Sequence, residues 1–250
     1  MNKMELSNQA LSLRRKLGED DLSPVDIFSL ILSIEKLTLV FYPLGFNISG
    51  ACIKGQSSAI IAINSDMSLG RQRFSMAHEL YHLMIDSGFS SVVCSRKLGK
   101  ENEIEKRADQ FASYFLMPPA ALYEAVQRYK KPEDPSLSLQ DIIRLEQYFG
   151  ISHQAMLIRL QEEYAITAEQ ASAMQRGVIS TAARLGMDVT LYKSCEENKK
   201  RRVYGYYITQ VERLFQKNKI SIGKQEELLL DAFRDDLVYG EIDEGGDLID

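Results

Sequence analysis

The pattern of hydrophobic and polar positions predicts helices and three short strands in the first part of the chain. Apolar side chains recur at three- and four-residue spacing over 5–17 and 24–36, which indicates helices. Three runs rich in β-branched and apolar residues follow, at 37–42, 48–53 and 59–63. Glycine and serine separate these runs, as is typical of a small, mostly antiparallel sheet.

The rest of the pattern is helical. Two central helices are predicted over 70–86 and 101–117, and two prolines end the second of them. Further helices are predicted over 119–130, 138–149, 152–164, 167–186, 206–218 and 223–237. The segment KKPEDPS at 130–136 has the composition of a linker, and the last dozen residues have that of a solvated or disordered tail.

These elements predict an α+β fold in which a small sheet packs on helices and a helical C-terminal region follows. We expect a core over 1–130 and a helix-turn-helix-like helical segment over 131–165. The third part, 166–250, is predicted to be helical and to carry an acidic tail.

Composition and charge are those of an ordinary globular protein, with 45% hydrophobic and 26% charged residues. The formal net charge of −5 argues against non-specific nucleic-acid binding, and the acidic balance of 138–163 disfavours DNA reading there. The basic run 199–202 is interpreted as a solvated surface, with docking to nucleic acid or an acidic partner as the alternative. Since neither a signal peptide nor a membrane span is recognisable, we expect a cytoplasmic protein.

Candidate chemistry begins with the sequence HELYH at 78–82, on the first central helix. Residues four apart on a helix lie roughly 6 Å apart on nearly the same face, so His78 and His82 can bind one ion. Glu79 lies about 100° round the helix, beside a metal-bound water rather than on the metal. The alternative is a helix with incidental polar residues, although two of the three histidines of the chain lie here.

The second central helix places two carboxylates among its apolar positions. Glu105 and Asp109 fall within the arc that carries Phe111 and Phe115. Because a buried carboxylate without a partner costs several kcal/mol, a cation should meet Glu105. Asp109 could then accept a hydrogen bond from a ligand histidine. The alternative pairs both carboxylates with basic neighbours such as Arg107 at the helix edge.

The cysteines and the remaining histidine are less informative. Cys52, Cys94 and Cys195 are odd in number and far apart, which indicates free thiols rather than a disulfide framework. Cys94 lies near the metal-site region and could be a thiol ligand or a switch, with simple packing as the more common state. His153, at a predicted helix start, is interpreted as a surface or cap residue rather than a ligand.

The two central helices carry a family resemblance. RFSMAHELYHLM (73–84) followed by EKRADQFASYFLMP (105–118) resembles the ImmA/IrrE metallopeptidases, whose second signature is approximately E-x-x-A-N/D-x-F-A-x-x-x-L-M-P. Both blocks, their order and their separation agree, and weaker similarity extends to 48–50 and 59–64. A tyrosine at position 81 departs from many relatives, which have a small residue there.

The resemblance implies a minimal zincin-like fold of the glutamate-ligand (gluzincin) type over 1–130. One zinc ion per chain would be bound by His78, His82 and Glu105, with Glu79 as general base and Asp109 as the supporting acid. Tyr81 and Tyr114 are possible oxyanion contacts. An extended substrate would pair with a strand edge beside the active helix, and we expect the run 59–63 to be that edge.

The resemblance also implies a biological role. Relatives commonly act on helix-turn-helix repressors of the xenobiotic-response-element (XRE) type, often encoded beside them in mobile-element or toxin–antitoxin operons. The expected function is therefore zinc-dependent cleavage of a separate repressor or antitoxin, which derepresses its genes. The alternative is a non-catalytic regulatory binding module with a structural or vestigial zinc site.

Overall fold

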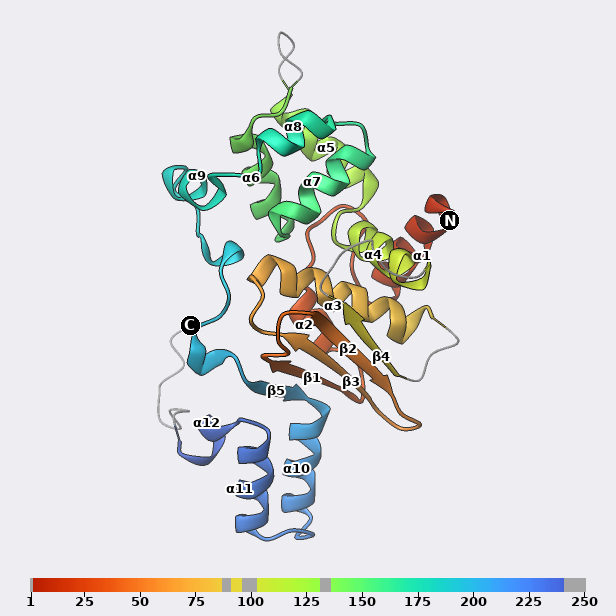
Figure 1. Cartoon of the computed structure of the whole chain (residues 1–250). Helices are drawn as coiled ribbons and strands as arrows, with labels where there is room; N and C mark the ends of the chain where they lie inside the picture. The colour runs from red at the N-terminus through yellow and green to blue at the C-terminus, as the bar shows by residue number, and fades with distance from the viewer. Residues whose placement is uncertain (1, 87–90, 96–102, 131–135, 241–250) are drawn as a thin grey trace, which may run out of the picture.

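A computed structural model describes residues 2–86, 91–95, 103–130 and 136–240 of the chain. Most of the predicted linker at 130–136 and the end of the acidic tail, 241–250, lie outside the described residues. The predicted α+β class is confirmed: a five-stranded sheet lies at the centre and helices pack on it and beyond it (Figure 1).

The sheet confirms the three predicted strands and adds two that the pattern did not show. Its strands are β1 (Leu37–Tyr42), β2 (Ile48–Lys54), β3 (Ala59–Asn64), β4 (Ser91–Ser95) and β5 (Arg202–Gly205). They lie in the order β4-β2-β3-β1-β5, and only β1 and β3 among these neighbours are parallel, so the sheet is mostly antiparallel as predicted.

The expectation that 59–63 forms an open edge is wrong. β3 is the middle strand, because β2 pairs with it on one side and β1 pairs with it on the other. The edges of the sheet are β4, which comes after the first central helix, and β5, which comes from the C-terminal region. Neither pairing is visible in local sequence, since each joins segments that are far apart in the chain.

The helices mostly follow the predicted pattern, although the helix predicted over 24–36 covers only Ile27–Leu32. They are α1 (Lys3–Lys16), α2 (Ile27–Leu32), α3 (Leu69–Met84), α4 (Glu103–Leu116), α5 (Pro119–Tyr129), α6 (Leu139–Phe149), α7 (His153–Glu162), α8 (Ala168–Ala173), α9 (Val178–Arg184), α10 (Tyr206–Gln216), α11 (Ile222–Asp231) and α12 (Asp235–Val238). The predicted helix 167–186 is two helices, since Gly177 between them has a φ of +76°. The predicted helix 223–237 is likewise divided, near Phe233 with a φ of +56°.

The core lies between the sheet and the helices that cover one of its faces. Leu39, Ile61 and Ile63 are fully buried on the face that α3 covers, and α4 packs across α3 with α1 beside it (Figure 1). One cluster of buried side chains runs from Leu6 to Ala171, so α5 to α8 share this core. The division of the chain at 130 and 165 remains a prediction.

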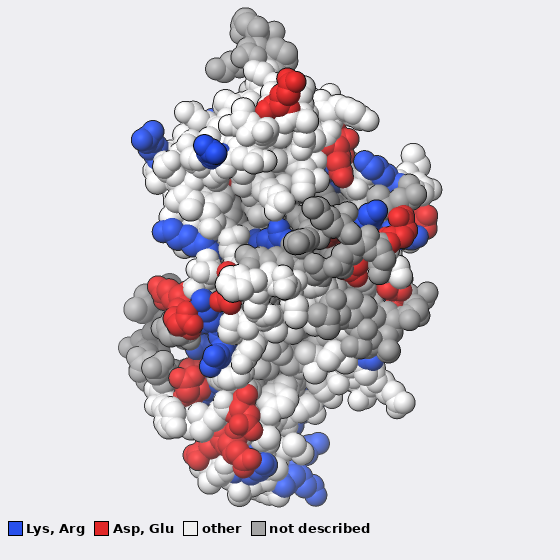
Figure 2. All heavy atoms as spheres, in the orientation of Figure 1, with Lys and Arg blue, Asp and Glu red and all other residues white. Residues whose placement is uncertain are grey.

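The face shown in Figure 2 mixes both signs of charge rather than gathering one of them. The basic run at 199–202 also has acidic side chains beside it, because Lys200 forms ion pairs with both Asp66 and Glu197, each at 2.8 Å. Within the described part of the chain, no helix has the length and apolarity needed to cross a membrane.

Candidate metal centre

The first central helix, α3, presents three ionisable side chains to the interior. His78, Glu79 and His82 are all buried, although the helix carries them within a five-residue stretch. Burial on adjacent faces is possible because β2 and β3 pack on one side of α3 and α4 packs on another. The imidazole rings of His78 and His82 lie one turn apart, with centroids separated by 5.1 Å.

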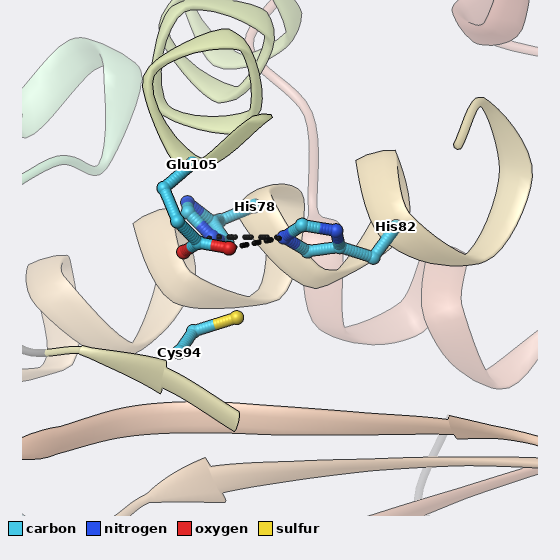
Figure 3. Close-up of side chains that lie close together, drawn as sticks. All are labelled: His78, His82, Cys94 and Glu105. Carbon is cyan, nitrogen blue, oxygen red and sulfur yellow. Dashed lines mark hydrogen bonds and ion pairs between the residues drawn. The ribbon is translucent and has the colours of Figure 1, made fainter. Parts of the chain in front are cut away.

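The second central helix adds a carboxylate to this pair. Glu105 lies in the first turn of α4, and its two oxygens lie 3.2 Å from His78 Nε2 and 3.4 Å from His82 Nε2. The two Nε2 atoms are themselves 3.3 Å apart (Figure 3). The alternative that paired this carboxylate with Arg107 at the helix edge is not what the structure shows, because Arg107 donates to the Tyr81 hydroxyl.

These separations provide a test of whether the three side chains fit a metal ion. Tetrahedral zinc with N and O ligands at about 2.0–2.1 Å requires ligand atoms to be about 3.3 Å apart. The two imidazole nitrogens are 3.3 Å apart, and the two oxygens of Glu105 lie 3.2 Å from one of them and 3.4 Å from the other, so every separation is close to that value. Two imidazole nitrogens and a carboxylate are also ligands that zinc accepts. The three predicted ligands therefore lie where one ion could bind them together.

The electrostatics of the cluster also favour a cation. Burial alone would lower the pKa of His78, but hydrogen bonds to Asp109 and Glu105 outweigh it and raise that pKa well above its usual value. Burial raises the pKa of Glu105, yet its contacts with the two histidines prevail and lower it. A proton on His78 thus supplies the positive charge that a metal ion would otherwise supply.

Two acidic side chains support the ligand histidines from behind. Asp109 Oδ1 lies 2.9 Å from His78 Nδ1, as the sequence predicted for this residue. Asp86 Oδ2 lies 3.5 Å from His82 Nδ1, a contact that was not predicted. Its signal was available, because Asp86 is four residues beyond His82. Carboxylates in these positions orient a ligand imidazole and leave its Nε2 free to face the ion.

Glu79 is placed beside the cluster rather than within it. Its carboxylate is fully buried, and Oε1 has no hydrogen-bond partner among the described residues. Gly50 in β2 makes room for it, since a Cβ there would lie only 2.6 Å from Glu79 Oε1. Burial raises the pKa of Glu79, as expected for a carboxylate that is to take up a proton. The sequence around 48–50 carries no local signal that this glycine accommodates Glu79.

Cys94, on β4, is the fourth side chain of the cluster. One ligand atom each from His78, His82, Glu105 and Cys94 lie within 4.8 Å of one another. The close-up shows the thiol pointing from the sheet toward the histidines and Glu105 (Figure 3). Cys52 and Cys195 are also free thiols and are not part of this group.

The two tyrosines considered as oxyanion contacts differ in position. Tyr81 is buried against Phe111 and the edge of His82, and its hydroxyl accepts a hydrogen bond from Arg107 at 3.1 Å. Tyr114 lies nine residues beyond Glu105, about half a turn round α4 and roughly 13 Å along it. Its ring packs beneath the guanidinium of Arg159, at 4.2 Å. The geometry disfavours Tyr114, and the role of Tyr81 remains a prediction.

His153 begins α7, as predicted, but it is not a simple surface residue. Nδ1 pairs with the fully buried carboxylate of Glu146, and Nε2 lies 3.0 Å from the carbonyl oxygen of Met174. The buried carboxylate requires a cationic or donating partner, which His153 provides. This pair joins the helices of the segment 131–165 and is separate from the metal-ligand cluster.

The elements that carry the cluster lie within a segment that matches a known protein family. Residues 40–161, just under half of the chain, match a peptidase family described as the IrrE N-terminal-like domain. The match runs from β1 into α7 and so includes α3, β4 and α4. A comparison with curated proteins finds no match.

Proposed function

Because residues 40–161 belong to the IrrE N-terminal-like peptidase family, which confirms the resemblance to ImmA/IrrE metallopeptidases, we propose that the protein is a zinc-dependent endopeptidase. The observation that supports this most strongly is the contact of Glu105 with the buried side chains of His78 and His82, with the unpaired Oε1 of Glu79 beside them. A site with only a structural role would have no use for a buried base at that position.

The chemistry follows from what each side chain can do. A divalent ion bound by the three ligands would supply the Lewis acidity that acidifies water and stabilises the oxyanion of peptide hydrolysis. Glu79 takes the proton from the attacking water and returns it to the leaving amine. Burial raises the pKa of this carboxylate, the direction that suits a group acting first as base and then as acid. Asp109 aligns the imidazole of His78 through a contact of 2.9 Å, and Asp86 lies 3.5 Å from His82 Nδ1.

The substrate segment is proposed to bind in extended form along β4. This strand is an edge of the sheet, pairs with β2 on its inner side and carries Cys94 into the cluster. A peptide that adds to such an edge gains backbone hydrogen bonds with little dependence on sequence. The scissile bond would then lie between β4 and the histidines of α3.

The substrate is proposed to be a separate helix-turn-helix regulator of the XRE type, a repressor or an antitoxin, whose cleavage derepresses its genes. The support for this is the likeness to ImmA/IrrE proteins. An edge strand recognises the backbone of a peptide and not its sequence. Specificity for one regulator would then come from contacts on either side of the cleaved segment.

The experiment is cleavage of a proteome-derived peptide library by the zinc-loaded protein, with new N-termini identified by mass spectrometry. Glu79→Gln should keep about one zinc per chain and lose cleavage by ~10²-fold or more, because base catalysis typically supplies that factor. His82→Ala should lose the metal itself. Cleavage at wild-type rate by Glu79→Gln would exclude the mechanism. A helix-turn-helix regulator of the XRE type that carries a cleaved sequence is then tested as an intact substrate.

One observation favours a second candidate, a regulatory binding module with a structural metal site. Structural zinc sites have four protein ligands, whereas catalytic sites keep one position open. Cys94 belongs to the same group as the three predicted ligands and could close the site. On this reading the library shows no cleavage by either the wild-type protein or Glu79→Gln, and both bind zinc equally.

A further inference from the structure

The thiol of Cys94 lies at the place where a catalytic water would have to be. Its Sγ donates a hydrogen bond to Glu79 Oε2 at 3.5 Å, and it belongs to the group formed by the three candidate ligands. A water activated in this site must likewise contact both Glu79 and the ion. The thiol and the water therefore compete for one position.

The backbone of the sheet aims Cys94 into that position. Cys94 lies directly opposite Gly50 in the antiparallel pair of β4 and β2, so both residues face α3. The register shifts between Ile48 and Gly50, where Ser49 is the extra residue and its Oγ donates to the carbonyl oxygen of Cys94. Bulges of this kind redirect a side chain beside a functional site. The inward orientation of the thiol is thus determined by the strand pairing.

The charges of the group balance with a thiolate present. Two neutral imidazoles, the carboxylate of Glu105 and a thiolate together carry two negative charges, which a divalent ion neutralises. The ion and its four ligands would then be neutral together, which lowers the cost of burying them. If a sulfur–metal bond formed, the S–H bond would break and its proton would pass to Glu79, whose Oε2 already accepts the hydrogen bond of the thiol.

We propose that Cys94 is a fourth, displaceable metal ligand, which closes the site and keeps the protein latent until substrate or water replaces the thiolate. This inference rests on the proposed function, since latency presupposes a peptidase. The four ligand atoms lie within 4.8 Å of one another, so only a small movement of β4 separates an open from a closed arrangement. The thiolate also favours zinc over the harder divalent ions, which prefer oxygen.

The first test is the spectrum of the full-length protein loaded with Co²⁺. A thiolate-to-cobalt charge-transfer band in the near ultraviolet is expected in the wild type and in the control Cys52→Ala, whose thiol is buried on the neighbouring strand. The band should be absent from Cys94→Ser and Cys94→Ala, each still binding one metal per chain. Circular dichroism verifies that both variants are folded. A wild-type protein that binds cobalt without the band overturns the proposal.

The second test measures displacement with acetohydroxamate, a small chelating probe of the open metal position. It should bind Cys94→Ser roughly tenfold or more tightly than the wild type, the scale on which changes around a metal site alter affinity. It should also abolish the band of the wild type when saturating. A band that persists at saturation means a permanent fourth ligand and overturns the displaceable role.

The outcomes for latency and for the peptidase itself are separable. Cys94→Ser should cleave the peptide library at least tenfold faster than the wild type, because no thiolate competes with water. Equal cleavage by both proteins contradicts latency and leaves the peptidase intact. If neither protein cleaves while the cobalt band appears and acetohydroxamate abolishes it, the ligand assignment stands and the proposed peptidase function fails.

Discussion

At the scale of single residues, the cluster brings two imidazole nitrogens and carboxylate oxygens close together. Such a group of hydrogen-bond acceptors needs a positive charge. The Nε2 atoms of His78 and His82 lie 3.3 Å apart and both face Glu105. Without a metal ion, the charge comes from a proton on His78, whose pKa is raised despite burial by its hydrogen bond to Asp109. A proton and a metal ion therefore compete for this imidazole.

This competition predicts that zinc binding releases a proton near neutral pH. The pKa of His78 is raised above its usual value of 6.5, so this imidazole stays protonated at pH values where a free histidine is neutral. The apparent zinc affinity should therefore fall as the pH decreases through that raised pKa. Calorimetry at pH 7 in buffers of different ionisation enthalpy should show about one proton released per zinc.

Asp109→Asn provides the matched control for proton release. The amide cannot accept as a carboxylate does, so the pKa of His78 falls and less proton is released on zinc binding. Equal proton release by the two proteins would show that Asp109 does not determine the charge of His78.

At the scale of elements, the position of Glu105 depends on how α4 is held. Arg14 on α1 is fully buried, and its guanidinium donates to the carbonyl oxygens of Phe115, Asp20 and Ser23. Phe115 lies in the last turn of α4, where carbonyl groups have no partner within the helix. One arginine thus anchors α4 at the end opposite Glu105.

Arg14→Met should lower both stability and zinc affinity. The change leaves three carbonyl oxygens without their donor, at a total of about 3 kcal/mol or more, which corresponds to roughly 6–12 °C in Tm for a protein of this size. Arg15→Met is the control, because Arg15 is exposed and pairs with Asp21 at the surface. Thermal unfolding and zinc titration measure the two effects. Unchanged zinc affinity in Arg14→Met would show that α4 is positioned without this anchor.

At the scale of the whole molecule, the two edges of the sheet have different origins. The candidate metal centre lies beside β4, whereas β5 covers the opposite edge and leads into α10 to α12 (Figure 1). Gly205 makes the turn from β5 into α10 and has a φ of +83°. A Cβ added at this position would lie only 2.5 Å from the carbonyl oxygen of Leu37. The C-terminal region is thus joined to the sheet on the side away from the metal ligands.

Gly205→Ala should therefore reduce stability without changing metal binding. A side chain in this backbone conformation costs about 1–3 kcal/mol, and the contact with Leu37 adds to it. Chemical unfolding should show the loss, while zinc per chain stays at the wild-type value. Gly223→Ala is the control, since a Cβ there meets nothing within 4 Å. Loss of zinc from folded Gly205→Ala would mean that the two edges are coupled.

The sequence by itself determined most of what depends on neighbours along the chain. Helical spacing placed His78 and His82 on one face of α3, and the apolar arc of α4 indicated that Glu105 needed a cation. The first three strands were also predictable, since alternation and turn residues are local signals.

Only the tertiary structure decided which segments meet. It placed β3 in the middle of the sheet rather than at its edge, brought β5 from the C-terminal region to β1, and put Cys94 against Glu79. Strand partners and bulges depend on hydrogen bonds between distant segments, for which a single sequence carries no periodic signal. The position of Cys94 in the site is therefore a property of the fold, while the metal ligands of α3 are already evident in the helix that carries them.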